Sequence, residues 1–364
     1  MPLKDGILFK INNNVNKLFK NKATIQASWG HHRILRNQMK NEAIDSSNLF
    51  QECRLCPRGC GTKRSEGTGQ KSAGFCGETA QLKVAYVGPH FGEEPPLVGT
   101  HGSGTVFFSG CSLRCSYCQN FQISREGMGE TLEVEELAER VMKMIEAHSV
   151  HNVNFVTPDH FFPHVFRLIS LLRRKGCDLP MVFYTSGYQS ISMLKMAEHF
   201  VDIYLPDFKY ADPSLAARFS KCKDYSEVAL RAISAMILQK GFLDSFESAS
   251  LLARKGVLVR HLILPGYTEN SINVLTTLYL EYGAHLPLSL MSQYMPVRHH
   301  EEENMNRPVT AEEFRKVYEH AIDLGFENLF VQFPGEGESR EPNKAPFLPD
   351  FTKHKPFSGG HPQD

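Results

Sequence analysis

The chain of 364 residues lacks an excess of charge of either sign. Lys and Arg together number 40, Asp and Glu also number 40, and the formal net charge is zero. A neutral chain creates no overall field that would attract the phosphates of nucleic acid or an anionic membrane surface. We therefore expect neither nucleic acid nor membrane among its partners.

Long hydrophobic runs are also missing. No stretch reaches the length of about 18 consecutive apolar residues that indicates a transmembrane helix. The first residues, Met1–Gly6, lack the apolar core of a secretory signal peptide. Hydrophobic residues nevertheless make up 41% of the chain, which is enough for a sizeable core. These features favour a cytoplasmic protein.

The nine cysteines are not spread along the chain as a disulfide framework would require. Seven of them fall into two tight groups, four within Cys53–Cys76 and three within Cys111–Cys118. Such grouping favours metal ligation in a reducing compartment. Cys177 and Cys222 stand alone, and we interpret each as an ordinary buried thiol.

The group of three has the spacing Cys111-x3-Cys115-x2-Cys118 and directly follows an apolar stretch, Thr105–Ser109. Thiolates this close can wrap around one face of an iron–sulfur cube, which normally takes four cysteines. Three ligands leave one iron open to bind a small molecule, just as a catalytic zinc keeps one position open. The alternatives are a zinc site or buried apolar cysteines, but zinc sites favour paired Cys-x2-Cys knuckles.

This triplet and its setting resemble the radical S-adenosylmethionine (SAM) superfamily. The resemblance implies that Cys111, Cys115 and Cys118 hold a 4Fe-4S cluster, that its open iron chelates the methionine end of SAM, and that Tyr117 packs on the adenine. In that family, reduction of the cluster cleaves SAM to a 5′-deoxyadenosyl radical, which abstracts hydrogen from a substrate. The chain is then expected to be an oxidoreductase.

The group of four cysteines predicts a second metal site. Cys53, Cys56, Cys60 and Cys76 lie in a Cys- and Gly-rich segment of turn-prone composition. Four soft ligands close a tetrahedral site, which suits zinc or a fully ligated iron–sulfur cluster. Such a site either relays electrons or pins the N-terminal loop, and we favour pinning because metal binding stabilises small loops strongly.

Beyond Gly104, short apolar strands alternate with amphipathic helices. The strand candidates are Val106–Phe108, Val153–Val156, Met181–Tyr184, Val201–Leu205, Val257–Leu264, Leu288–Met291 and Leu329–Val331. Apolar stripes, such as Val134, Leu137 and Val141, predict the helices between them. This alternation implies an α/β fold with a parallel sheet and right-handed crossovers. Six such units fit the partial (β/α)6, TIM-like barrel that the resemblance implies, although periodicity alone also allows an eight-unit barrel or a doubly wound sheet.

We expect four regions along the chain. They are a polar N-terminal arm (1–50), a Cys-rich metal-binding segment (51–83), the radical SAM core (84–332) and a Pro/Gly-rich C-terminal tail (333–364). The tail is expected to be extended or to lie as a lid over the barrel.

Polar residues follow the predicted strands, where ligands bind in parallel α/β folds. Ser186 follows the third strand, Asp207 and Lys209 follow the fourth, and His261 belongs to the fifth. These segments resemble the pyruvate formate-lyase activating enzyme branch of the superfamily, which implies that Asp207 and Lys209 contact SAM, with Ser186 and His261 behind them. The alternatives are a salt bridge between Asp207 and Lys209, and a His buried for structural reasons.

One stretch departs from the family. Many radical SAM enzymes carry Gly-Gly-Glu after the second strand to receive the SAM ammonium, whereas this chain has Thr157-Pro158-Asp159-His160. A turn that contains proline cannot copy the glycine geometry. We therefore expect Asp159 to accept the ammonium directly.

The resemblance also implies partners and substrates. Activating enzymes act on a glycyl-radical enzyme and take electrons from a low-potential donor such as flavodoxin or ferredoxin, while a small-molecule or peptide substrate stays equally open. Two further classes are a ferredoxin-like electron carrier, disfavoured by the three-ligand motif and the long chain, and a zinc-stabilised nucleic-acid-binding protein, disfavoured by the neutral charge.

Overall fold

The computed structural model describes residues 47–64, 74–246, 252–334 and 348–357. The predicted arm (1–50) therefore lies almost entirely outside the described residues. The strands are β1 (Lys83–His90), β2 (Ser103–Phe108), β3 (Glu130–Thr131), β4 (Val153–Val156), β5 (Met181–Thr185), β6 (Ile203–Pro206), β7 (Gly256–Val257), β8 (Val259–Leu262), β9 (Leu288–Met291) and β10 (Leu329–Val331). The α-helices are α2 (Ser47–Gln51), α3 (Pro95–Val98), α4 (Phe121–Ser124), α5 (Val134–His148), α6 (Phe162–Arg174), α7 (Ile191–Ala197), α8 (Pro213–Ser220), α9 (Tyr225–Lys240), α10 (Thr268–Tyr282) and α11 (Ala311–Leu324).

The strands form two sheets that continue one another. One has the order β3-β1-β2-β4-β5-β6-β7 and the other β10-β9-β8, with parallel pairing throughout except at β1 and β3. A parallel bridge between Asp207 and Arg260 links β6 to β8. The predicted α/β fold with a parallel sheet is thus confirmed. Pairing among the described strands leaves both ends of this curved sheet open, so they do not close into a barrel.

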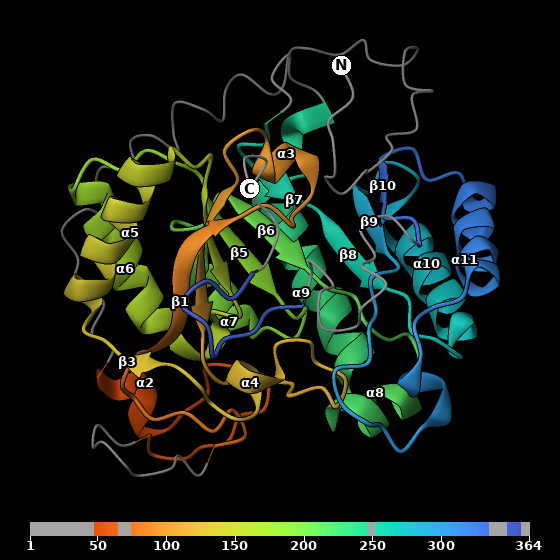
Figure 1. Ribbon diagram of the computed structural model, residues 1–364, viewed down its shortest axis with the longest axis horizontal. Helices are drawn as coiled ribbons and strands as arrows, with labels where there is room; N and C mark the ends of the chain where they lie inside the picture. The colour runs from red at the N-terminus through yellow and green to blue at the C-terminus, as the bar shows by residue number, and fades with distance from the viewer. Residues whose placement is uncertain (1–46, 65–73, 247–251, 335–347, 358–364) are drawn as a thin grey trace.

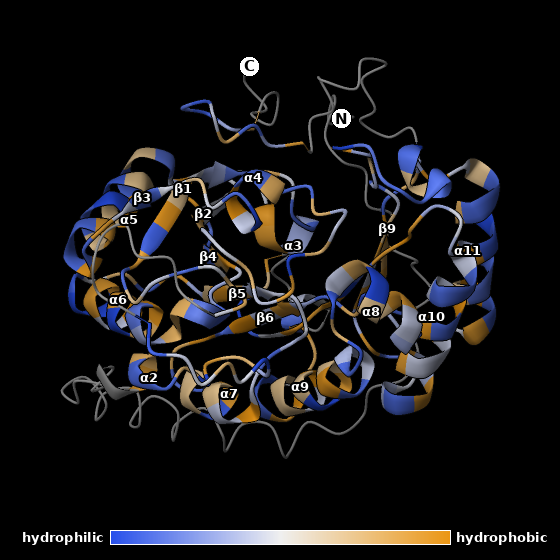
Figure 2. Cartoon of the chain, turned by 90° about the horizontal axis from the view of Figure 1, so that it is seen from below, coloured by the Kyte–Doolittle hydropathy of each residue, from blue (hydrophilic) through white to orange (hydrophobic). Residues whose placement is uncertain are grey.

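Helices cover the convex side of the curved sheet, from α5 and α6 around to α10 and α11 (Figure 2). Alternate residues of β5 show how the sheet is packed. Phe183 points to the helices and stacks on Phe162 of α6, whereas Val182 points to the concave side and packs with Leu97 of α3. Both faces of the central strands are therefore buried, which explains why they read as continuous apolar runs.

The main differences from the sequence-based expectation are one predicted strand that is split in two and two strands, β1 and the short β3, that were not predicted. The predicted strand Val257–Leu264 is split into β7 and β8, because β7 pairs with β6 on one side and bridges to Phe242 on the other. Strand β1 was not predicted at all. It contains Gly88 and Pro89, which are typical of turns, and its position beside the short β3 at the end of the sheet tolerates the missing N–H of proline.

The described part of the C-terminal tail lies on the concave side against β1 and β2, as Figure 1 shows in dark blue. The rings of Phe351 and Phe357 lie 5.5 and 5.4 Å from that of Phe107 in β2. The Asp350 carboxylate accepts a hydrogen bond of 3.2 Å from Gln122 in α4. Of the predicted tail (333–364), residues 335–347 and 358–364 lie outside the described residues. Of the described helices, none combines the length and the apolar character that crossing a membrane requires.

Helix α11 begins with a capping box that also ties it to the loop after β8. The Thr310 hydroxyl accepts from the Glu313 N–H, and the Glu313 carboxylate accepts from the N–H groups of Thr310 and Gly266. Two guanidinium nitrogens of Arg307 lie 2.7 and 2.8 Å from the same carboxylate. These contacts, led by the Arg307 hydrogen bond, lower the pKa of Glu313 to about 2.

We predict that Glu313→Gln destabilises the protein in a pH-dependent way. A carboxylate with a lowered pKa stabilises the fold above its ordinary pKa, and this contribution is lost as the pH falls toward 2. The variant should lose about 1–2 kcal/mol of unfolding free energy at pH 7, and the deficit should shrink at pH 3. Urea denaturation at both pH values measures this. Glu319→Gln on the same helix, which breaks only an exposed pair with Arg315, should change little; equal stability of Glu313→Gln and the parent at pH 7 would contradict the prediction.

Candidate functional site

The predicted site residues gather at the carboxyl ends of the parallel strands. In Figure 1 this is the lower edge of the molecule, where α2, α4 and α8 lie. The cysteine loop follows β2, and α4 begins just after it. The N-terminal Cys-rich segment lies beside this loop, so that the two predicted metal-binding groups are neighbours.

The three cysteines of the loop share a buried environment. Cys115 is buried, and Cys111 and Cys118 are half-buried. Burial raises the pKa of the Cys111 thiol, and the neighbouring charges of Cys115, Asp159 and Cys118 raise it further. The charge of Cys115 likewise raises the pKa of Cys118, after the larger effect of burial. Thiols packed this closely need a nearby cation to become thiolates together, and a metal centre supplies it.

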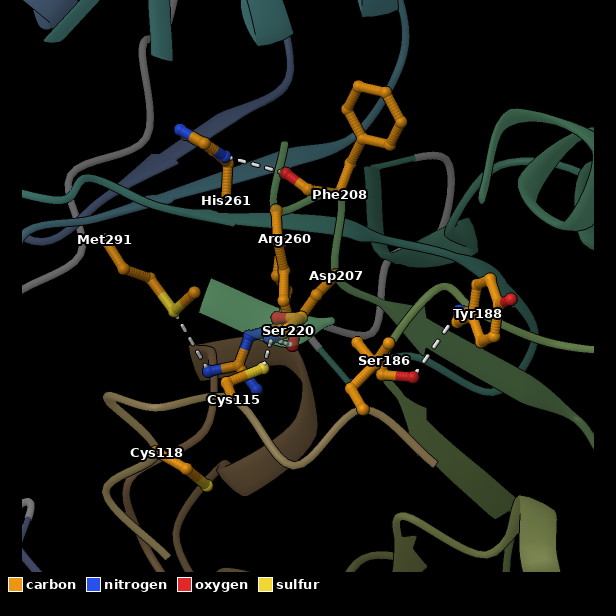
Figure 3. Close-up of polar contacts among 12 residues, drawn as sticks. Cys115, Cys118, Ser186, Tyr188, Asp207, Phe208, Ser220, Arg260, His261 and Met291 are labelled. Carbon is orange, nitrogen blue, oxygen red and sulfur yellow. Dashed lines mark hydrogen bonds and ion pairs between the residues drawn. The ribbon is translucent and has the colours of Figure 1, made fainter. Parts of the chain in front are cut away.

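Each of the three sulfur atoms accepts one hydrogen bond from the protein. The donor to Cys111 is the Leu113 N–H at 3.3 Å, and the donor to Cys118 is the Ser124 hydroxyl at 3.3 Å. The donor to Cys115 is the Ser220 hydroxyl at 3.0 Å, drawn in Figure 3. Ser220 is the last residue of α8. Hydrogen-bond donors around the sulfur atoms are typical surroundings of iron–sulfur ligands.

The donor set consists of thiols. Sulfur ligands are soft and suit an iron–sulfur cluster, in which each thiolate binds a different iron. Cys111, Cys115 and Cys118 lie on one loop, and each sulfur has a hydrogen-bond donor of its own. These residues therefore fit a 4Fe-4S cluster. Among the residues that the structure describes, no three His, Cys, Asp or Glu side chains are arranged as the ligands of a single metal ion.

Tyr117 lies in an aromatic cluster next to the cysteines. Its ring meets those of Phe219 and Tyr294 edge to face, with centroids 5.9 and 6.2 Å away. Its hydroxyl lies 2.8 Å from that of Tyr210. The ring is thus held rigidly beside Cys118, which is where a flat contact for an adenine would be needed.

The ends of β5 and β6 bring Ser186 and Asp207 together. The Tyr225 hydroxyl donates to the carbonyl oxygens of both residues, at 2.8 and 2.9 Å. Gly187 has a φ of +78°, and a Cβ atom there would collide with the carbonyl oxygen of Asp207. Only glycine fits this close approach without strain. The two strand ends that the sequence analysis selected are therefore packed directly against each other.

Asp207 and Lys209 form a salt bridge, which the sequence analysis gave as the alternative to contact with SAM. Burial is the largest single effect and lowers the pKa of Lys209, but the charges of Asp207, Tyr117, Cys115 and Tyr225 together outweigh it, so that the pKa lies well above its ordinary value. The second carboxylate oxygen of Asp207, Oδ1, is buried without a hydrogen-bond partner. An unsatisfied buried carboxylate oxygen is costly, so the site is suited to a ligand that donates a hydrogen bond there.

His261 is fully buried, and both of its ring nitrogens are engaged within the protein. Nδ1 lies 2.7 Å from the Phe208 carbonyl oxygen, as Figure 3 shows, and Nε2 lies 2.9 Å from the Ser271 hydroxyl. Burial lowers its pKa to about 4. The ring therefore joins β8 to the segment between Asp207 and Lys209, and it can influence those residues only through the backbone.

Asp159 contacts the cysteine loop and begins a short 3-10 helix, Asp159–Phe161. It is fully buried, and its Oδ2 atom accepts a hydrogen bond of 2.7 Å from the Ser112 hydroxyl. Its Oδ1 atom has no hydrogen-bond partner. Burial raises its pKa to about 6. The carboxyl group thus supports the residue next to Cys111.

The four N-terminal cysteines lie close to this loop. Cys53 and Cys76 are buried, and Cys56 and Cys60 are half-buried. Burial raises the pKa of Cys56, and the charges of Asp159, Cys76 and Cys53 add to the effect. The Cys60 sulfur accepts from the Phe75 N–H at 3.4 Å. Residues 65–73 between Cys60 and Cys76 lie outside the described residues.

Residues 105–278 match the family model of the radical SAM superfamily. The chain contains a radical SAM domain. The matched range begins in β2 and ends in α10, so it includes the cysteine loop and the ends of β4, β5, β6 and β8. A radical SAM domain implies a 4Fe-4S cluster and SAM as cofactors.

Similar proteins include one of named activity. An uncharacterised protein of Methanocaldococcus jannaschii is 27% identical over 296 residues, which cover 78% of each chain. The pyruvate formate-lyase-activating enzyme of Clostridium pasteurianum is 27% identical over 188 residues, which cover 51% of this chain and 72% of that enzyme. The radical SAM superfamily was thus correctly recognised from the cysteine motif.

Solved structures with a similar fold include HydG, a maturase of the FeFe-hydrogenase, and methylornithine synthase. HydG has a TM-score of 0.44 at 12% identity, with 65% of this chain and 53% of HydG covered. Methylornithine synthase has a TM-score of 0.37 at 14% identity, with 65% and 73% covered. The chain spans about half the length of HydG.

The radical SAM domain also holds a buried ion cluster that sequence reasoning missed. Arg260 of β8 points to the concave side, where its guanidinium lies 3.1 Å from Glu93, 3.0 Å from Glu94 and 4.4 Å from the ring of Tyr184. It also donates to the Met291 sulfur, as seen in Figure 3. Arg260 lies within the predicted strand Val257–Leu264 but was not among the candidate site residues. The two glutamates precede α3, more than 160 positions away, and no local signal pairs them with β8.

Proposed function

We propose that this radical SAM domain binds a 4Fe-4S cluster through Cys111, Cys115 and Cys118 and cleaves SAM reductively. When bound, the cluster supplies the electron that converts SAM to a 5′-deoxyadenosyl radical, which abstracts hydrogen from the substrate. The observation that carries this proposal is the three-thiol loop at the end of β2, with one hydrogen-bond donor to each sulfur. The family match over the same residues supports it.

The side chains around the loop suit the parts of SAM. Tyr117 offers an aromatic face for the adenine. Lys209 offers a cation for the carboxylate, and the unpartnered Oδ1 atom of Asp207 offers an acceptor for the ammonium. Ser186 orients this pair, because Tyr225 joins its carbonyl to that of Asp207. Since these groups are all largely buried, little water would compete for them.

Asp159 and His261 have less direct roles in this proposal. Asp159 holds the cysteine loop through Ser112. Its Oδ1 atom, which has no hydrogen-bond partner, is the alternative to Asp207 as the acceptor of the ammonium, and it is the one that the sequence analysis predicted. His261 fixes the segment between Asp207 and Lys209 through the Phe208 carbonyl.

For the substrate, we propose a glycyl-radical enzyme whose glycine loses a hydrogen atom, with flavodoxin or ferredoxin as the electron donor. This finer assignment is supported by the similarity to the Clostridium pasteurianum enzyme. The competing class is a small molecule or a peptide. Incubation with a glycyl-radical enzyme encoded beside this chain should give the doublet of a glycyl radical in electron paramagnetic resonance (EPR) spectra. Turnover of SAM with no such doublet would favour the competing class.

The four N-terminal cysteines are proposed to bind a second metal, as zinc or as an iron–sulfur cluster. The charge of Cys53 raises the pKa values of both Cys56 and Cys76, in addition to the larger effect of burial, which supports a common site. Arg64 is fully buried in the same segment and donates to the carbonyl oxygens of Thr79 and His160. In this proposal, the metal and the arginine side chains together attach the Cys-rich segment to the domain.

We predict that Cys111→Ala, Cys115→Ala and Cys118→Ala each abolish SAM cleavage while the fold stays largely intact. None of the three ligands is redundant, because only three hold the cluster. Formation of 5′-deoxyadenosine under dithionite, after anaerobic reconstitution, measures the activity. Cys177→Ala, which removes a lone buried thiol, is the matched control and should cleave SAM like the parent. Parent-like turnover in any loop variant would sink the assignment of the cluster ligands.

The second group of cysteines should behave differently. Cys53→Ala and Cys76→Ala are expected to lose one metal site and thermal stability but to keep some SAM cleavage, because four ligands fill a site and leave no position for substrate. Metal and sulfide analysis of each purified variant decides this. A metal content equal to that of the parent would show that the four cysteines are not a ligand set.

A further inference from the structure

The three donors to the cysteine sulfurs differ in where they come from. Leu113 lies within the cysteine loop itself, and Ser124 lies in α4 just beyond it. Ser220 is the last residue of α8 and stands 105 positions from Cys115. Its hydroxyl therefore contacts the loop only because α8 packs there. This bond, at 3.0 Å, is the shortest of the three.

Ser220 is fully buried and part of a hydroxyl network. Its Oγ atom lies 2.8 Å from the Tyr210 hydroxyl, which lies 2.8 Å from that of Tyr117. A cysteine that ligates iron is a thiolate and can only accept. The single proton of Ser220 is donated to the Cys115 sulfur, whereas Tyr210 donates its own proton to the Tyr117 oxygen. Ser220 is thus buried between the sulfur and Tyr210, with the sulfur as the acceptor of its proton.

Arg58 of the Cys-rich segment holds the backbone of Ser220. Its guanidinium donates to the Ser220 carbonyl at 2.7 Å, to the Ser112 carbonyl at 2.9 Å and to the Lys221 carbonyl. The same group stacks on the Phe75 ring at 3.8 Å. The last carbonyls of a helix lack partners within the helix and favour a cation. One arginine between Cys56 and Cys60 thereby clamps the end of α8 to the cysteine loop.

We propose that the Ser220 hydroxyl is a positioning group that raises the reduction potential of the cluster through Cys115, and that Arg58 keeps it in place from the Cys-rich segment. The proposal rests on the proposed function, in which Cys115 is a cluster ligand. A hydrogen bond to a ligand sulfur withdraws negative charge from the cluster, so the reduced state becomes easier to reach. The N-terminal segment thus affects the electron-accepting step without touching the iron.

The test is a redox titration of the full-length, reconstituted protein with dithionite, followed by the EPR signal of the reduced cluster in the absence of SAM. Ser220→Ala should reduce the equilibrium constant for one-electron reduction about three- to tenfold, which is a midpoint potential about 30–60 mV more negative. Ser226→Ala is the matched control. Its hydroxyl donates to the Tyr210 carbonyl at 2.9 Å and not to sulfur, so the potential should equal that of the parent.

A second pair of variants tests the clamp. Arg58→Ala should shift the potential in the same direction as Ser220→Ala, and Arg58→Lys, which can restore one donor, should recover part of the shift. Arg54→Ala in the same segment removes an exposed arginine that pairs only with Glu52 and should leave the potential unchanged.

The outcomes separate this proposal from the proposed function. If the parent binds no iron and sulfide, the proposed function fails. If the parent and Ser220→Ala both bind a full cluster and share one potential, the role of Ser220 is overturned. Where Ser220→Ala binds less than a full cluster, Ser220→Cys, with its weaker S–H donor, takes its place, and an unshifted or more positive potential overturns the proposal.

Discussion

The loop between Cys111 and Cys118 must hold three thiols in a fixed arrangement, and one short loop cannot do this alone. Its support comes from three directions. Asp159 accepts a hydrogen bond from the Ser112 hydroxyl, and Arg58 of the N-terminal segment donates one to the Ser112 carbonyl. At the end of α8, the Phe219 carbonyl accepts a hydrogen bond of 2.8 Å from the Ser116 N–H. Each of these supports is polar and directional, and they add to the packing of Leu113 and Tyr117 in the core.

The N-terminal segment belongs to the site for the same reason. It has few apolar residues of its own, and arginines attach it to the domain. Arg58 reaches the cysteine loop and α8, Arg64 reaches the Thr79 and His160 carbonyls, and Arg114 of the loop reaches back to the Phe75 carbonyl at 3.3 Å. The guanidinium group suits this task, because it carries several donors in one plane and stacks on rings such as Phe75. Loss of the proposed metal would therefore loosen the segment without freeing it.

A strand or site was predictable from the sequence where its residues are close together in the chain, and it was missed where the interacting residues are far apart in the chain. Strands β4 and β9 have the predicted bounds, because each is a short apolar run with polar neighbours. Strand β1 was missed because Gly88 and Pro89 are typical of turns, whereas the strand forms through pairing with β2 and β3. The cysteine loop was readable because its ligands are close in sequence. The Ser220 donor and the glutamates around Arg260 could not be predicted, because only folding brings Ser220 close to Cys115 and the glutamates close to Arg260.

Asp207 connects the proposed SAM-binding groups to the buried ion cluster on the concave side. Its carboxylate pairs with Lys209, while its backbone bridges to Arg260, whose own partners are Glu93 and Glu94. Burial is the main cause of the raised pKa of Glu93. The positive charge of Arg260 lowers this pKa, and the negative charge of Asp207 raises it. These five residues include three acids and two bases. Because burial raises the pKa values of Glu93 and Glu94, a state in which all three acids are ionised is disfavoured. A cation beside Asp207, such as the ammonium that the proposed function places there, would favour the ionised acids and couple the two groups of residues electrostatically.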